Sequence, residues 1–167
     1  GLIHEEKGHV GSLRRIVPDI GDHQLVATTA VAEVIVATYE DGPHNAEAII
    51  ATQSGIRVVT KTSGLAGVYR LDGSVLRLER SLSDDPGLVT DANISLDGRY
   101  TILRTYGSIR IGSTGGSDVT SALTSVGCTM PFNEPQGESV TFLPDGSGLV
   151  TASEIAPTTL KIIRPPS

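Results

Sequence analysis

The chain has 167 residues, which suits one domain that can bury a hydrophobic core without disulfide bonds. Hydrophobic residues make up 38% and charged residues 19%, a globular composition that excludes a disordered chain. The net charge of −6, with no basic cluster beyond Arg14 and Arg15, argues against nucleic acid as a partner. No apolar run approaches the roughly 20 residues of a membrane helix, so we expect no membrane span.

The apolar runs are short, rich in β-branched residues and bounded by Gly, Asp, Ser and Pro, which is typical of strands. Residues 1–24 fit no pattern and are set apart as an N-terminal segment from a repeat domain over residues 25–167. The strongest predicted strand covers residues 31–39. Further strands are predicted at residues 58–60, 75–78, 101–103 and 149–151.

A repeat of three units organises the chain, near residues 46–80, 90–126 and 137–163. Each unit has an apolar strand, a turn ending in glycine, a second strand and a third strand with the order apolar, basic, apolar. The turn glycines Gly55, Gly98 and Gly146 are 43 and 48 residues apart. This period matches the roughly 40 to 50 residues of a four-stranded β-propeller blade.

We therefore predict an all-β fold with about three propeller-like blades of four antiparallel strands, a partial propeller, with a small β-barrel or sandwich as the alternative. Residues 75–78 and 119–123 are the expected fourth strands of the first two blades. The third unit has no evident fourth strand. The strand at residues 31–39 either closes the last blade or is the outer strand of a preceding, truncated blade.

Three blades cannot close a ring, because propellers have about 4 to 8 of them. The unpaired faces would expose apolar surface. We therefore expect self-association, or a second polypeptide that completes the propeller.

Several phrases of the sequence resemble known bacterial propellers. Asp-Gly-Arg-Tyr at 97–100 and Pro-Asp-Gly-Ser at 144–147 resemble the turns of TolB-like and WD40-type propellers. Residues 19–22, 39–48 and 134–138 together resemble a group of uncharacterised, exported propellers that are common in actinobacteria. The resemblance covers roughly residues 19–163, about half of the usual length of that group, and implies an extracellular or exported bacterial protein.

Candidate site residues are the acids at the start of each first strand: Glu47, Asp91 and Glu138. First strands line a propeller's axis, so these carboxylates would converge there, and Asp41 and His44 in the preceding loop would join them. A shared divalent cation, Ca²⁺ or another, would relieve the repulsion between carboxylates. Alternatively, each acid accepts hydrogen bonds from backbone amides of a neighbouring blade.

The function expected from these features is a non-catalytic binding or assembly module. One alternative is a divalent-cation-dependent hydrolase of a phosphate or ester substrate, with the acids as its axial site. A further alternative is a small-molecule-binding or cyclase-type pocket. The sequence leaves open whether the protein is an enzyme.

Overall fold

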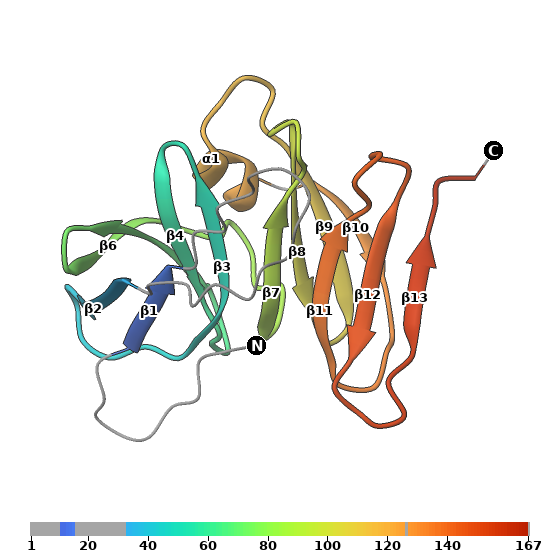
Figure 1. Cartoon of the computed structure of the whole chain (residues 1–167), viewed down its shortest axis with the longest axis horizontal. Coiled ribbons are helices and arrows are strands. Elements are labelled where there is room, and N and C mark those ends of the chain that lie inside the picture. Colours follow the sequence, from blue (N-terminus) through green and yellow to red (C-terminus); the bar gives the residue numbers. More distant parts are fainter. Residues whose placement is uncertain (1–10, 16–32, 126, 167) are drawn as a thin grey trace, which may run out of the picture.

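The computed structural model describes residues 11–15, 33–125 and 127–166. Its strands form three sheets that lie side by side in chain order (Figure 1), called here the first, second and third sheets. Their initial strands, β3 (Ala46–Thr52), β7 (Val89–Ile94) and β11 (Gly137–Phe142), are neighbours in space. The predicted all-β, propeller-like architecture is confirmed.

The first sheet contains a complete blade of four antiparallel strands. After β3 come β4 (Gly55–Thr60), β5 (Gly67–Asp72) and β6 (Val75–Ser81). Gly55 has a φ of +112°, a conformation that glycine adopts without steric cost, and this permits the tight turn between β3 and β4. The fourth strand expected at residues 75–78 is confirmed as β6.

The second sheet also has four strands: β7, β8 (Tyr100–Thr105), β9 (Ser108–Ser113) and β10 (Cys128–Pro131). The fourth strand predicted at residues 119–123 is wrong, because these residues lie in the helix α1 (Val119–Thr124). The Asp118 side chain accepts a hydrogen bond from the Ser121 amide and caps the helix. Helical spacing then turns Val119 and Leu123 into the core against the first and second sheets.

The third sheet has only three strands in the described chain: β11, β12 (Leu149–Ser153) and β13 (Leu160–Ile163). Gly146 has a φ of +70° in the turn between β11 and β12. On the side of β13 away from β12, no described strand is paired.

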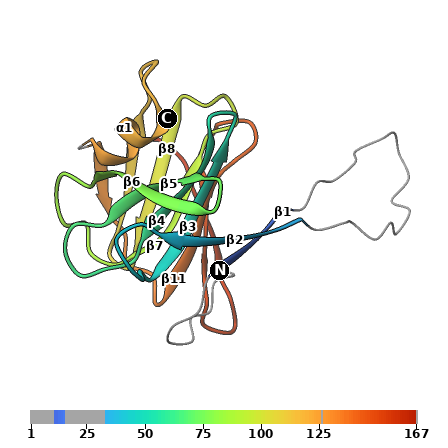
Figure 2. The ribbon, with the colours of Figure 1, turned by 90° about the vertical axis from the view of Figure 1, so that its left-hand side faces the viewer.

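Two N-terminal strands, β1 (Gly11–Arg15) and β2 (Glu33–Tyr39), form an antiparallel pair that extends the first sheet beyond β6. β2 runs parallel to β6, in register at Thr38–Val75 and Tyr39–Leu76. Figure 2 shows β2 crossing one side of the curled sheet. Of the two interpretations of this strand, closure of the last blade is not what the single chain shows, because β2 lies beside the first sheet. Of residues 1–24, the structure describes β1 alone.

We call the face of a sheet that is turned toward the next sheet in chain order its trailing face, and the opposite face its leading face. For the third sheet, the trailing face is the one turned away from the second sheet. One apolar core fills the space between the first and second sheets and includes Val59, Val68 and Leu103. Another, with Ile102 and Val140, fills the space between the second and third sheets. The described part of the chain has no helix with the length and hydropathy that a membrane crossing requires.

Candidate functional site

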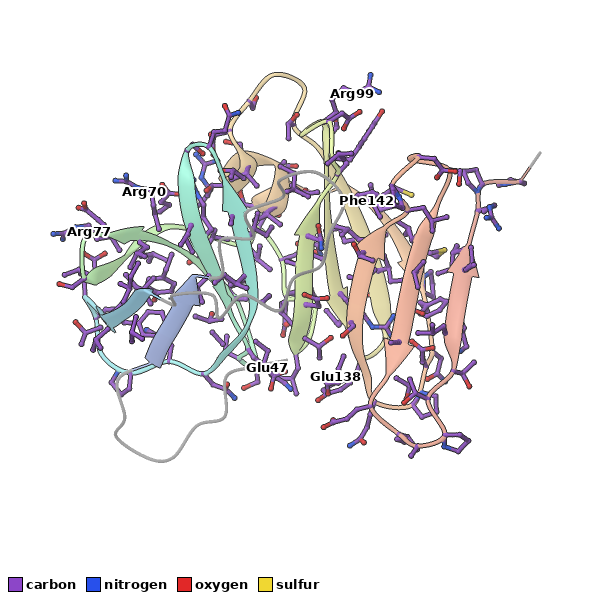
Figure 3. The ribbon with its side chains drawn as sticks, viewed as in Figure 1. Glu47, Arg70, Arg77, Arg99, Glu138 and Phe142 are labelled. Atoms are coloured by element: carbon purple, nitrogen blue, oxygen red, sulfur yellow. The ribbon has the colours of Figure 1, made fainter. Side chains whose placement is uncertain are left out.

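Two of the predicted axial acids belong to one polar network at one end of the initial strands. Glu47 and Glu138 lie at this end, on β3 and β11 (Figure 3). Lys61, just after β4, places its Nζ 2.5 Å from Glu47 Oε2 and donates a hydrogen bond to the Tyr106 hydroxyl at 2.9 Å. The Tyr106 hydroxyl donates in turn to Glu138 Oε1 at 2.8 Å. All three sheets are thus joined by one chain of hydrogen bonds, called here the axial network.

The axial network sets the charge of its members. Partial burial opposes the charged form of Lys61, but its hydrogen bonds to Glu47 and Tyr106 outweigh burial and raise its pKa. The hydrogen bond from Lys61 favours the phenolate of Tyr106, yet burial and the hydrogen bond to Glu138 together raise its pKa. At neutral pH the network therefore holds a lysine cation and a protonated tyrosine between two carboxylates. Lys61 supplies positive charge at the place where the sequence suggested a metal ion.

Asp91, the remaining predicted acid, lies on β7 and accepts hydrogen bonds from backbone amides. Its carboxylate accepts from the Val140 amide of the neighbouring sheet at 2.7 Å and from the Ala92 amide at 2.8 Å. Burial raises the pKa of Asp91, and the two amide hydrogen bonds oppose that rise. This geometry matches the structural role that the sequence left open beside metal binding.

Asp41 and His44 form a separate cluster with Tyr69, on the leading side of the first sheet. The carboxylate of Asp41 lies 2.9 Å from His44 Nε2 and accepts a hydrogen bond from the Tyr69 hydroxyl at 2.7 Å. The Tyr69 hydroxyl also lies 3.0 Å from His44 Nε2. The hydrogen bond from Tyr69, reinforced by His44, lowers the pKa of Asp41, while burial and Asp41 raise that of Tyr69. Within the described residues, no three His, Cys, Asp or Glu side chains are grouped so that they could hold a metal ion.

Sequence reasoning missed a second link between sheets, centred on Arg104 of β8. This side chain is fully buried, with Nε donating to the Gly137 carbonyl and Nη2 to Glu134 Oε2, both at 3.0 Å. Glu134 is also buried, and Lys161 Nζ lies 3.5 Å from its Oε1. A Cβ atom at Gly137 would lie 1.5 Å from Arg104 Nη2, so only glycine leaves room for the guanidinium.

The two links arise at different positions of the repeat. Lys61 follows the end of its second strand, whereas Arg104 lies within its second strand opposite Asp91, where the first unit has Val59 and the third has Ala152. The signal in the sequence was a basic residue close to the apolar run of a second strand. In both units this side chain reaches the next sheet.

The trailing face of the third sheet is apolar and uncovered. Strand pairing places Val150 opposite Ile162 and Ala152 opposite Leu160 on this face, and Leu160 and Ile162 are 68% and 56% exposed. In the second sheet the matching residues are Ile102 opposite Ile111 and Arg104 opposite Ile109, and both Ile102 and Ile109 are fully buried against the third sheet. The third sheet thus repeats an interface pattern on which no described segment of the chain is docked.

The leading face of the first sheet, by contrast, is covered by its own chain. Ala37 of β2 packs with Val58, Tyr69 and Leu76, and Tyr39 packs against the same cluster. The row of sheets therefore has one covered end and one open end.

A hollow of about 240 Å³ lies at the opposite end of β3 from the axial network. It is lined mostly by short polar side chains from the β3–β4 turn and the segment before α1. Its volume is below the roughly 300–1,000 Å³ of ordinary ligand pockets.

No protein-family profile and no curated protein matches the chain. Among solved structures, it is similar to hydrazine synthase from Kuenenia stuttgartiensis, with 14% sequence identity and a TM-score of 0.55. The match covers 83% of this chain and 37% of that chain, so the chain spans little more than a third of its neighbour's length. At this identity the likeness concerns the fold alone, and it supports the propeller-like assignment.

Proposed function

We propose that this chain is a non-catalytic assembly module, and that its trailing face on the third sheet binds a second copy of the chain. The observation that carries this proposal is the exposure of Leu160 and Ile162, because their counterparts in the second sheet pack against the third sheet: Ile109 is fully buried and Ile111 is partly buried. The resemblance to exported bacterial propellers supports a place outside the cytoplasm.

The energetics favour a bound state of this face. Full burial of one large aliphatic side chain contributes about 1.5–3 kcal/mol, and this face offers Leu160 and Ile162 together with the partly exposed Val150. Charged side chains are absent from its central positions, because Lys161 lies on the other side of β13 by strand alternation. Docking of an apolar sheet would therefore bury apolar surface with little desolvation of charge.

The mass in solution tests this proposal, by light scattering after size exclusion over a range of concentrations. We expect twice the 17.4 kDa of the single chain. The double substitution Leu160→Glu with Ile162→Glu should return the mass to that of one chain. The matched control is Leu96→Glu, which charges an apolar residue of 89% exposure in a turn outside this face, and it should leave the dimer intact. A wild-type monomer at every concentration would overturn the proposal.

The hydrolase alternative requires the axial acids to bind a divalent cation. Lys61 already pairs with Glu47, and backbone amides bind Asp91, so no contact in the described residues favours this function over assembly. It stays a prediction from the sequence. Thermal stabilisation by Ca²⁺ that Glu47→Gln abolishes would favour it.

A further inference from the structure

β2 has the chain position of a fourth strand whose own sheet is missing. In the first and second sheets, the fourth strand directly precedes the initial strand of the next sheet, as β2 directly precedes β3. In β10, Cys128 pairs with Ile111. Cys128 precedes Gly137 by the same number of residues as Ala37 precedes Ala46, and Gly137 and Ala46 both begin an initial strand. Ala37 of β2 therefore corresponds to Cys128.

The third sheet lacks the strand that β2 could supply. β13 pairs with β12 on one side, and its other edge has no partner in the described chain. Within one chain β2 cannot reach this edge, because β2 and β13 lie at opposite ends of the row of sheets (Figure 1). Among the described strands, β2 and β13 can therefore pair only between two copies.

We propose that two copies close a ring of six sheets, in which β2 of each copy pairs antiparallel with β13 of the other. This inference rests on the proposed self-assembly and names its contacts. Six sheets lie within the usual range of about 4 to 8 blades, and a twofold dimer leaves no open end. The partner subunit's β13 takes the position beside β2 that β1 has in the single chain.

The register follows from the second sheet. Ile162 pairs with Val150 as Ile111 pairs with Ile102, so Ile162 corresponds to Ile111. Because Ile111 pairs with Cys128, Ala37 should lie opposite Ile162 of the partner subunit. Antiparallel pairing then sets Val36 opposite Ile163, Thr38 opposite Lys161 and Tyr39 opposite Leu160. Apolar residues meet apolar residues at three of these four positions, and Thr38 meets the basic residue.

This arrangement replaces the pairing of β2 with β1, keeps the contacts of β2 with its own first sheet and covers its exposed side chains. Ala37 stays packed on Val58 and Tyr69 of its own first sheet, and β2 keeps its short parallel pairing with β6. Val34 and Val36, now 52% and 54% exposed, come to lie on the face of the partner sheet that includes Ile163. The partner's first sheet covers the trailing face with Leu160 and Ile162.

Disulfide trapping tests the register directly. In a Cys128→Ser background, which removes the only native thiol, one chain carries Ala37→Cys and a second, differently tagged chain carries Ile162→Cys. After mixing and mild oxidation, we expect a covalent dimer of the two tagged chains on non-reducing gels. The matched control replaces Ile162→Cys by Lys161→Cys, one position along the strand and on the opposite face, and should give several-fold less covalent dimer.

The outcomes separate this inference from the function on which it rests. A dimer in solution whose 37–162 pair is trapped no better than the 37–161 control would overturn the strand pairing and leave self-assembly standing. A monomer would overturn both. Amide hydrogen exchange provides a measurement on the native cysteine background: the amides of Leu160–Ile163 that point away from β12 should be protected in the wild type and lose that protection in the Leu160→Glu, Ile162→Glu variant. Equal exchange in both proteins would also overturn the pairing.

Discussion

At both junctions between sheets, a basic side chain from one sheet binds an acidic side chain, but the two pairs differ in burial. Between the first and second sheets, Lys61 reaches Glu47 and Tyr106 at the edge of an apolar core, and its side chain stays partly exposed. Between the second and third sheets, Arg104 and Glu134 are both buried. A basic residue in or just after the second strand is thus a peripheral link at one junction and an interior ion pair at the other. The comparison teaches that the contribution of such a link to stability depends on how deeply it is buried, and not on residue type alone.

The largest effect should come from breaking the buried pair. Arg104→Ala leaves the Glu134 carboxylate buried without its main partner, and we expect a loss of about 3–5 kcal/mol in the free energy of unfolding. Chemical denaturation measures it. The double variant Arg104→Met with Glu134→Leu removes both charges and should lose much less. If the double variant is as unstable as Arg104→Ala, the ion pair is not the source of the loss.

A smaller loss is expected for Gly137→Ala. The added Cβ would overlap the Arg104 guanidinium, and overpacking of this kind costs about 1–3 kcal/mol. The control is Gly107→Ala, where a Cβ would meet nothing within 4 Å. In the Arg104→Met background, the cost of Gly137→Ala should shrink. If Gly137→Ala costs as much in that background as in the wild type, the Arg104 side chain is not what requires glycine at position 137.

The smallest effect belongs to the axial network. Lys61→Met removes charge-assisted hydrogen bonds at a partly exposed position, so we expect a loss of about 1–2 kcal/mol at neutral pH, less than for Arg104→Ala. The folded-state pKa of Lys61 lies above its ordinary value of 10.5, so its contribution is complete below pH 10.5 and is lost as pH rises through the folded pKa. The difference between wild type and variant should therefore shrink in alkaline solution. If the difference in unfolding free energy between wild type and variant grows in alkaline solution, the pKa of Lys61 is not raised by folding.

Much of the fold follows from local sequence pattern. Gly98 and Gly146 have positive φ values of 71° and 70°, as the predicted turns need, and the flanking alternation defines β8 and β12. The strand predicted at residues 119–123 was wrong because a short apolar run fits a strand and a helix equally well. The cap at Asp118 was the available signal for the helix.

The candidate site was less predictable, because it depends on which faces meet. Placing Glu47 and Glu138 at one end of the initial strands needed only the repeat, and the structure places both there. The role of Lys61 as their intermediary required knowing that its side chain crosses to the second sheet. Asp41 and His44 precede Glu47 by a few residues, yet their loop turns them toward Tyr69 on the leading side, which strand alternation does not reveal.

The glycine at position 137 has a consequence for reading relatives of this chain. Its φ is not positive, so no turn or unusual backbone conformation demands glycine there. What demands it is a side chain from a different sheet, 33 residues earlier in the chain. Positions 104 and 137 should therefore vary together through evolution: a larger residue at 137 should accompany a shorter one at 104, and a glycine at 137 should mark an arginine or lysine at 104.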